Sequence, residues 1–430
     1  MYQLGRRVEP FRALLYDSER AGSLRDLIAP PYDLIGPELQ RLLYERNPHN
    51  IVRIELAREP DRYQASARLL RNWIDGGIMR RAARPAIYHY AQRFAIEGQT
   101  RTRVGLMVRL RLESFSSGRI RPHERTFPAA KEDRLRLLTA TETNVSPIFG
   151  LYEGRHPELA ELCVRVGERE ALLSATDDSG IENQLREIAE SGEIELVQRA
   201  LEAAPLLIAD GHHRYETALE YRRRRREADR EPAGLRPCDY TLAALVACDD
   251  PGLVILATHR VVRRLGPQAL TTLAARAADL FEVTTLADRA ELRRRLRAAR
   301  RGALGVALRE PAGFYLMRLR DRGAMASILP DAHAAVRELD VSILHGAILD
   351  RLCGISPEAV RAGGNIEYTI DFDGALDAVA GGDADAAFLM NPPTIEDVER
   401  VSAAGATMPE KSTYFFPKLA TGLVLNPLHD

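Results

Sequence analysis

The chain has 430 residues, of which 45% are hydrophobic and 28% charged, a composition typical of a globular protein of about two or three domains. Its formal charge of −1 argues against a surface that attracts nucleic acid or anionic lipid by its overall field. The first residues lack an apolar signal core, and no apolar run approaches the length of a membrane span. Four scattered cysteines argue against a disulfide framework or a zinc site, so we expect a cytoplasmic protein without nucleic-acid or membrane partners.

Lysine is scarce in this chain. Three of the 60 basic residues are lysines, namely Lys131, Lys411 and Lys418. Because arginine serves for nearly every surface charge, a remaining lysine indicates a position that needs a compact, rotatable ammonium. Lys131 and Lys411 lie in polar segments described below, and for them we expect a functional role. Lys418 follows an aromatic pair, and we expect it to tolerate arginine better than Lys411 does.

The N-terminal part of the chain contains a stiff proline loop. Ala29-Pro-Pro-Tyr-Asp is extended, because each proline fixes its own φ and restricts the residue before it. The loop would hold Tyr32 and Asp33 as the wall of a pocket, and Asn47 opens a turn that would lead into a strand over residues 51–56. The remaining pattern predicts helices over 37–45 and 63–75 and an antiparallel pair of strands over 86–94 and 103–112.

A polar segment from His123 to Arg134 interrupts the apolar pattern. The apolar spacing resumes only at Leu135, so the segment predicts a loop followed by the first turn of a helix. The alternative to a functional role is a solvated, ion-paired helix start. The candidates are His123 and Glu124 for a general base and, for cofactor binding, Lys131 and Arg134 together with Asn144 and Ser146, which lead into the next strand.

The most informative segment runs from Leu206 to Glu216, with the sequence Leu-Leu-Ile-Ala-Asp-Gly-His-His-Arg-Tyr-Glu. The apolar run ends at Asp210 and a helical pattern follows, which predicts a buried strand, a glycine turn and a helix. A helix N-terminus favours a phosphate, and Arg214 would add a bidentate fork. Asp210 could hold a metal or a hydroxyl; the alternative is that it only caps the helix. The candidates here are Asp210, Gly211, His212, His213 and Arg214.

The second half of the chain predicts alternating helices and strands. We expect an N-terminal domain over residues 1–264 and a C-terminal α/β region over 265–430, giving a mixed α/β (α+β) fold. The pattern is helical from 157 to 204, with a turn at Asp177-Asp-Ser-Gly, and again from 330 to 353.

A third polar segment, residues 408–422, closes the chain. It is not a P-loop, because the glycines of that motif are missing. The functional interpretation is a C-terminal lid, and the alternative is a plain terminal strand over residues 412–416. Lys411, Ser412 and Tyr414 are its candidates for phosphate contacts.

Together these segments resemble the domain-of-unknown-function 1015 family, a prokaryotic family without an assigned reaction. The resemblance covers the chain nearly end to end and rests on Ala29-Pro-Pro-Tyr-Asp, Asn47-Pro-His-Asn, His123-Glu-x-Thr, Lys131-x-Asp-Arg, Asn144-x-Ser-Pro, Ala209-Asp-Gly-His-His-Arg-Tyr-Glu, Asn391-Pro-Pro-Thr and Met408-Pro-Glu-Lys-Ser-Thr-Tyr-Phe. The Asp-Gly-His-His-Arg box is also similar to the phosphate-binding box of the ParB/sulfiredoxin-like superfamily, which includes free serine kinases. This second resemblance implies an N-terminal ParB/sulfiredoxin-like phosphate-binding unit with inserted helices.

The resemblance to free serine kinases implies a nucleotide-dependent phosphotransferase that uses ATP or ADP with Mg²⁺ and acts on a small molecule, free serine or phosphoserine. Phosphoryl transfer asks mainly for positioning and charge neutralisation. Glu124 or His123 would be the base on the acceptor hydroxyl, and Asp210 would hold Mg²⁺. The other implied roles are phosphoryl binding for His212, His213 and Arg214, charge neutralisation for Lys131 and Lys411, and substrate binding for Tyr32, Asp33 and Asn47.

Two other functions stay open. One is a phosphatase or nucleotide hydrolase that uses the same anion pocket with water as the acceptor, and the other is a non-catalytic nucleotide-sensing module. We expect Glu124, Lys131 and residues 210–214 to line one cleft, because polar clusters that interrupt apolar strands usually converge on a site. The acceptor, the nucleotide base and homo-oligomerisation are left open by the sequence.

Overall fold

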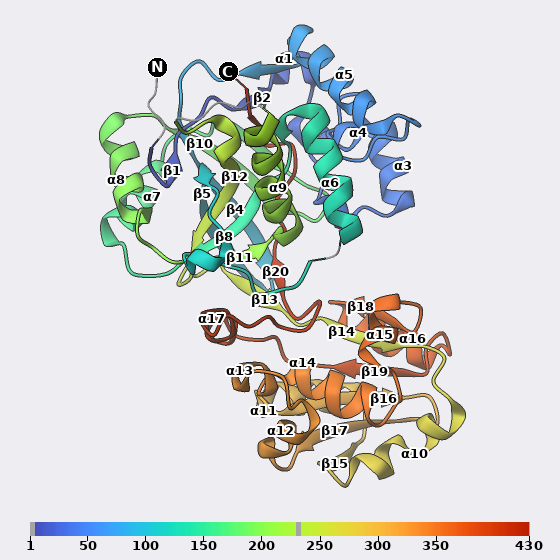
Figure 1. Cartoon of the computed structure of the whole chain (residues 1–430). Coiled ribbons are helices and arrows are strands. Elements are labelled where there is room, and N and C mark those ends of the chain that lie inside the picture. The colour runs from blue at the N-terminus through green and yellow to red at the C-terminus, as the bar shows by residue number, and fades with distance from the viewer. Residues whose placement is uncertain (1–4, 127, 229–233, 430) are drawn as a thin grey trace. The chain divides into compact units, whose positions relative to one another are not determined.

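The computed structural model describes residues 5–126, 128–228 and 234–429, which form two compact units (Figure 1). Unit 1 comprises Met1–Pro122, Thr126–Leu253 and Pro417–Asp430, and unit 2 comprises His123–Arg125 and Val254–Phe416. Both units combine sheets with helices, which confirms the expected mixed α/β class. Within the described ranges, no helix is both long and apolar enough to cross a membrane.

Unit 1 is built on a nine-stranded mixed sheet in the order β6-β11-β8-β12-β5-β4-β10-β9, with β1 beside β5. The strand β11 runs parallel to β6 on one side and antiparallel to β8 on the other. Its apolar residues are all buried, which explains why the run is continuous rather than alternating. The strands of unit 1 are β1 (Val8–Glu9), β2 (Leu14–Tyr16), β3 (Met79–Arg81), β4 (Ile87–Ile96), β5 (Gln99–Arg111), β6 (Ile120–Arg121), β7 (Thr143–Asn144), β8 (Ile148–Tyr152), β9 (Leu173–Thr176), β10 (Glu182–Ile188), β11 (Leu206–Asp210), β12 (Tyr240–Ala247) and β21 (Asn426–Pro427).

Helices cover the sheet of unit 1, with α7 and α8 packed together and α6 beside α9 (Figure 1). Leu159 and Leu162 of α7 and Ile194 and Val197 of α8 recur at helical spacing and are buried in the main core cluster. The helices of unit 1 are α1 (Ser18–Ala21), α2 (Leu24–Leu27), α3 (Pro37–Arg46), α4 (Val52–Glu55), α5 (Arg62–Asp75), α6 (Pro128–Thr141), α7 (Pro157–Gly167), α8 (Ser191–Leu201) and α9 (His212–Ala228), with 3₁₀ turns η1 (Tyr32–Leu34), η2 (Phe115–Ser117) and η3 (Pro237–Asp239).

Unit 2 has a six-stranded sheet in the order β15-β17-β16-β19-β14-β18, in which every neighbouring pair is antiparallel. Residues of α11 and α16 are buried against this sheet in a second core cluster. The elements of unit 2 are β13 (Val254–Leu256), β14 (His259–Val262), α10 (Pro267–Ala277), β15 (Phe281–Leu286), α11 (Arg289–Ala299), β16 (Ala303–Leu308), β17 (Gly313–Leu319), η4 (Arg322–Ala324), α12 (Met325–Ile328), α13 (Ala334–Arg337), α14 (Asp340–Ile343), the π-helix η5 (Leu344–Asp350), α15 (Pro357–Ala362), β18 (Ile366–Thr369), α16 (Phe372–Ala380), β19 (Ala386–Leu389), α17 (Ile395–Ala403) and β20 (Tyr414–Phe416).

The units divide the chain at places other than residue 264. The strands β13 and β14 pair with β20, β18 and β19 and so belong to unit 2. The last residues of the chain belong to unit 1, because Thr421 and Ala29 exchange backbone hydrogen bonds and β21 pairs with β7. The polar segment 408–422 is therefore shared between the two units.

Three local expectations were wrong. Residues 51–56 hold the helix α4 instead of a strand, because Ile51, Val52 and Ile54 are fully buried by tertiary packing that overrides their strand propensity. The stretch 157–204 contains the antiparallel pair β9–β10 between its two helices, joined through the Asp177-Asp-Ser-Gly turn. The stretch 330–353 is broken into short helices and ends in the π-helix η5.

Gly252 provides a test of the packing in unit 1. A Cβ at this position would meet the Thr102 carbonyl oxygen and would lie 2.5 Å from the Arg103 nitrogen, both of them backbone atoms. We expect Gly252→Ala to lower the free energy of unfolding by about 1–3 kcal/mol, because backbone cannot move aside as a side chain can. The matched control is Gly192→Ala in α8, where nothing lies within 4 Å. It should be neutral or stabilising by up to about 1 kcal/mol in urea unfolding. Equal stability of the two variants would contradict the packing described here.

Candidate functional site

The site predicted from residues 206–216 is formed where β11 meets α9. The pairing of β11 with β8 shifts register between Ile208 and Asp210, and such a bulge re-aims the side chain that follows it. Gly211 has a φ of +90°, a conformation that favours glycine. A Cβ there would also lie 3.0 Å from Nε and from Nη2 of Arg214. The turn therefore requires glycine for two reasons, and it brings the Arg214 guanidinium back over the backbone.

Asp210 lies between two cations. Its carboxylate oxygens are 3.5 Å from Lys418 Nζ and 3.4 Å from Arg214 Nη2. Burial would raise the pKa of Asp210, but Lys418, Arg214 and His212 together lower it to about 2. Arg103 is 1% exposed; burial lowers its pKa to about 10, against the effects of Tyr90, Asp250 and Asp210. Asp210 is therefore ionised and holds a group of cations together.

The guanidinium of Arg214 has one buried donor, Nε, that the described part of the fold leaves without a hydrogen bond. Its Nη1 donates to the Pro147 carbonyl and its Nη2 faces Asp210, whereas its buried Nε has no hydrogen-bond partner among the described residues. Arg214 also lines a cavity of about 50 Å³, room for a few waters or one small anion. The structure thereby brings together, around this cavity, four predicted cofactor-binding residues: Arg134, Asn144, Ser146 and Arg214.

Three of these four side chains are already engaged within the fold. Arg134 is ion-paired with Glu55 at 2.9 Å and with Asp133, and its guanidinium lies 4.3 Å from the ring centre of Tyr32. Asn144 Oδ1 accepts from the Leu242 backbone nitrogen and from Asn426 Nδ2, and Ser146 is bonded to Thr421. Their contacts shape the cavity, and Arg214 is the member that keeps an unpaired buried donor.

Two of the three lysines form ion pairs with carboxylates of the segment Leu206–Glu216. Lys131 Nζ is 2.7 Å from Glu216, and Lys418 is paired with Asp210. The side chain of Lys418 is only 13% exposed, and the expectation that this position tolerates arginine better than Lys411 stays a prediction. Sequence reasoning missed Lys418 as a site residue, although the scarcity of lysine was the signal that could have found it.

The predicted substrate residues divide into two groups. Burial raises the pKa of Tyr32, and Arg214 and Arg134 act in the opposite direction, which brings Tyr32 within electrostatic reach of the box. Asp33 is exposed. Asn47 is engaged in its own turn: its Nδ2 donates to the Ala21 carbonyl and its Oδ1 accepts from the His49 nitrogen.

His123 and Glu124 belong to unit 2, where they meet the C-terminal polar segment. His123 is fully buried, and its Nε2 lies 2.9 Å from the Thr413 hydroxyl, which donates to Glu124 Oε1 at 3.5 Å. Lys411 is exposed, with a φ of +54°, and Ser412 donates to the Pro409 carbonyl. The single cleft expected for Glu124, Lys131 and the box stays a prediction, because these residues are divided between the two units.

The strand alternative for the C-terminal segment is seen in part. Tyr414 lies in β20, which pairs with β13.

The surroundings of Asp210 do not fit a resident Mg²⁺ ion. Magnesium binds through carboxylates and waters in near-ideal octahedral geometry, whereas both oxygens of Asp210 face cations. Among the residues that the structure describes, no group of three or more His, Cys, Asp or Glu side chains could hold a metal ion.

The ion pair between Lys418 and Asp210 can be tested by its dependence on pH. The pKa of Asp210 is lowered from 3.8 to about 2, so its charged carboxylate stabilises the fold fully at pH values above 3.8. That contribution is lost as the pH falls through about 2. We expect Lys418→Gln to cost about 1 kcal/mol of unfolding free energy at pH 7, with the difference shrinking as the pH falls below about 4.

Lys131→Gln is the control for this experiment, since Lys131 is 36% exposed. It should cost less, about 0.5 kcal/mol. A loss for Lys418→Gln that stays constant from neutral pH to acid pH would show that the ammonium does not act on Asp210.

Several solved structures are similar to this chain at low sequence identity. Solved structures similar to it include a conserved hypothetical protein from Pyrococcus furiosus, with 13% identity over 73% of this chain and 92% of the other and a TM-score of 0.36. A variant of a free serine kinase in complex with ADP has 12% identity over 72% and 87%, with a TM-score of 0.36. SbnI with a C-terminal truncation, from Staphylococcus aureus, has 12% identity over 75% and 87%, with a TM-score of 0.34.

No curated protein matches the chain. The model of the family described as "Protein of unknown function (DUF1015)" matches residues 8–342, and the chain therefore belongs to this family.

Proposed function

We propose that unit 1 binds the phosphate of a small phosphorylated molecule at the turn between β11 and α9. The observation that carries this proposal is the buried Nε of Arg214, a charged donor without a partner among the described residues, beside a small cavity. An unpaired buried donor is costly, and an anion would relieve that cost with a charge-assisted hydrogen bond.

The charge of the surroundings supports the same ligand. Arg214, Lys418 and Arg103 gather around one carboxylate, that of Asp210. The positive end of the dipole of α9, a helix of 17 residues, lies at the same turn. In this arrangement Asp210 orients the cations and the incoming phosphate supplies the second negative charge.

The reaction we propose for this site is phosphoryl transfer from ATP or ADP to a small hydroxyl compound. We propose free serine as the acceptor, because the Asp-Gly-His-His-Arg box is similar to that of a superfamily that includes free serine kinases. The acceptor oxygen forms a bond to the terminal phosphorus, and the bond from that phosphorus to the nucleotide oxygen breaks. The acceptor proton passes to a general base, for which Glu124 and His123 are the candidates. We assign no step to a metal ion on Asp210.

Arg214 is the residue on which phosphate binding depends. We expect Arg214→Ala to weaken the binding of ADP by about 1.5–3 kcal/mol in isothermal titration calorimetry, the scale of a hydrogen bond to a charged group. The control is Arg224→Ala on the same helix, where the side chain is 55% exposed and pairs with Glu220. If ADP binds the two variants equally well while only Arg214→Ala melts early, Arg214 is a structural residue.

Turnover tests the reaction itself. Purified protein is incubated with terminally radiolabelled ATP or ADP, with and without serine, and we expect label to appear in phosphoserine. Label released as phosphate without an acceptor would indicate a hydrolase, and saturable binding without turnover would indicate a sensor; both results contradict the transfer reaction.

The base is assigned by variants in the same assay. Glu124→Gln or His123→Gln, whichever removes the base, should lower kcat by about 10²-fold or more with nucleotide binding unchanged. Wild-type kcat in both variants would remove both residues from the mechanism.

A further inference from the structure

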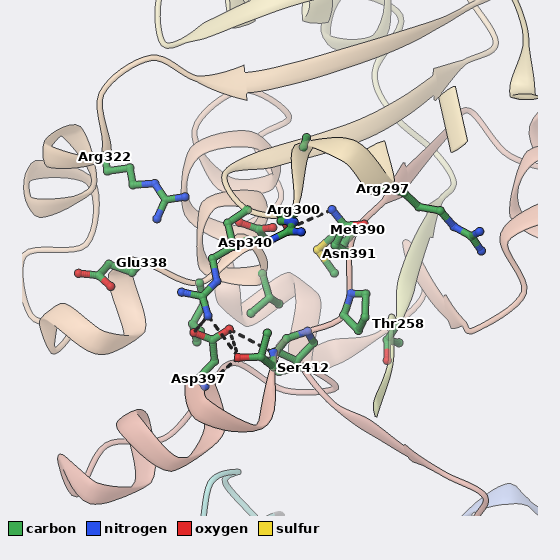
Figure 2. A pocket seen from close by; sticks show the side chains of 17 residues that line it. Thr258, Arg297, Arg300, Arg322, Glu338, Asp340, Met390, Asn391, Asp397 and Ser412 are labelled. Atoms are coloured by element: carbon green, nitrogen blue, oxygen red, sulfur yellow. Dashed lines mark hydrogen bonds and ion pairs between the residues drawn. The ribbon is translucent and has the colours of Figure 1, made fainter. Parts of the chain in front are cut away.

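Unit 2 contains a large cavity of its own, whose lining includes several charged side chains. Its volume is about 690 Å³, within the range of small-molecule sites. Figure 2 shows Arg322, Asp340, Asn391 and Asp397 around it, supplied by η4, α14, the loop before α17 and α17 itself. The lining includes the Asn391-Pro-Pro-Thr motif and Ser412, residues that the sequence singled out and to which the proposed function gives no role.

The carboxylates of this cavity are occupied by groups of the protein. Asp397 pairs with Arg301 and Arg400 at 3.0 Å each, and Glu338 pairs with Arg400. Asp340 accepts a hydrogen bond from the Gly302 nitrogen at 2.7 Å. Burial raises the pKa of Asp340 to about 6 and Arg322 and Arg301 act in the opposite direction, so this carboxylate lies within electrostatic reach of Arg322.

Two arginines of the lining have no such partner. Within the described ranges, neither Arg300 nor Arg322 forms an ion pair with a carboxylate. Their guanidinium groups add positive charge to the lining, and each presents a planar fork of donors that can bind an oxyanion.

The backbone next to these two exposed side chains makes specific contacts. Arg300 has a φ of +57°, uncommon for a residue other than glycine, and its carbonyl accepts from Asn391 Nδ2 at 3.0 Å. The same amide group binds the Leu296 carbonyl at 2.8 Å, so the Asn391-Pro-Pro-Thr loop is fastened to the end of α11. A Cβ on Gly302 would lie 3.0 Å from Arg322 Nη2, so glycine lets that guanidinium rest against the chain.

A buried hydroxyl gives a second, independent indication of a ligand. Thr258 lines the cavity and is 5% exposed, yet its Oγ1 has no hydrogen-bond partner among the described residues. Buried hydroxyls in native proteins are usually bonded. Met390, Pro392 and Pro393 offer apolar surface in the same lining.

We propose that this cavity is a second binding site, in unit 2, for a small organic anion. Arg300 and Arg322 provide the positive charge for its phosphate or carboxylate group, and the Thr258 hydroxyl donates to another polar group of the ligand. Met390, Pro392 and Pro393 contact its carbon skeleton. The ligand is a metabolite-sized molecule, and its site is separate from the Arg214 site of the proposed function.

The experiment uses the full chain carrying Arg214→Ala, so that the phosphate site of unit 1 is removed first. Inorganic phosphate and citrate are titrated in separate calorimetric runs, which distinguishes a phosphate ligand from a carboxylate ligand. We expect one of the two probes to bind at a single site. Adding Arg322→Gln should weaken it by about ten-fold or more, the loss of one charged fork.

Two further variants control this result. Arg294→Gln lies on α11, where its side chain is 71% exposed, and it should leave binding unchanged. Thr258→Val removes the hydroxyl and keeps the shape, and it should weaken binding by about three-fold or more without a fall in melting temperature. Absence of binding for both probes, or equal binding with and without Arg322→Gln, would overturn the proposal and leave the Arg214 site unaffected.

Discussion

The contact between Asp210 and its cations is the constraint on which unit 1 depends. Asp210 ends a buried strand, Arg214 returns over Gly211, and Lys418 comes from the last segment of the chain. An ionised carboxylate in this position has to be paired, so the C-terminal segment must return to unit 1. The same segment is bonded through the Pro417 carbonyl to Arg103, which places a further cation close to the box.

Local patterns in the sequence were enough to predict the element that carries the site. A continuous apolar run, a glycine and a helical pattern predicted β11, its turn and α9, and all three are present. The sequence could not predict which polar side chains would form their hydrogen bonds and ion pairs within the protein. Arg134 is hydrogen-bonded to Glu55, a residue 79 positions away, and Asn144 to Asn426. Nothing in the sequence next to either residue indicates its partner. Lys418 was missed for the same reason, since its partner is determined by a long-range contact.

Strand and helix were confused where tertiary packing outweighs local preference. Residues 51–56 are rich in isoleucine and valine, yet they form α4 because the fold buries them on several sides. The strand β10 has polar residues, Asn183 and Arg186, at buried positions, so its sequence lacks the apolar alternation that indicates a strand.

The central claim is that Arg214 binds an oxyanion, and a heavy-atom phosphate mimic tests it most directly. Crystals of the full chain would be soaked in tungstate and an anomalous difference map calculated. The account predicts a peak within hydrogen-bond distance of Arg214 Nε, at the cavity next to Asn144 and Ser146. A map with no peak there, while tungstate occupies exposed arginines elsewhere, would contradict the account.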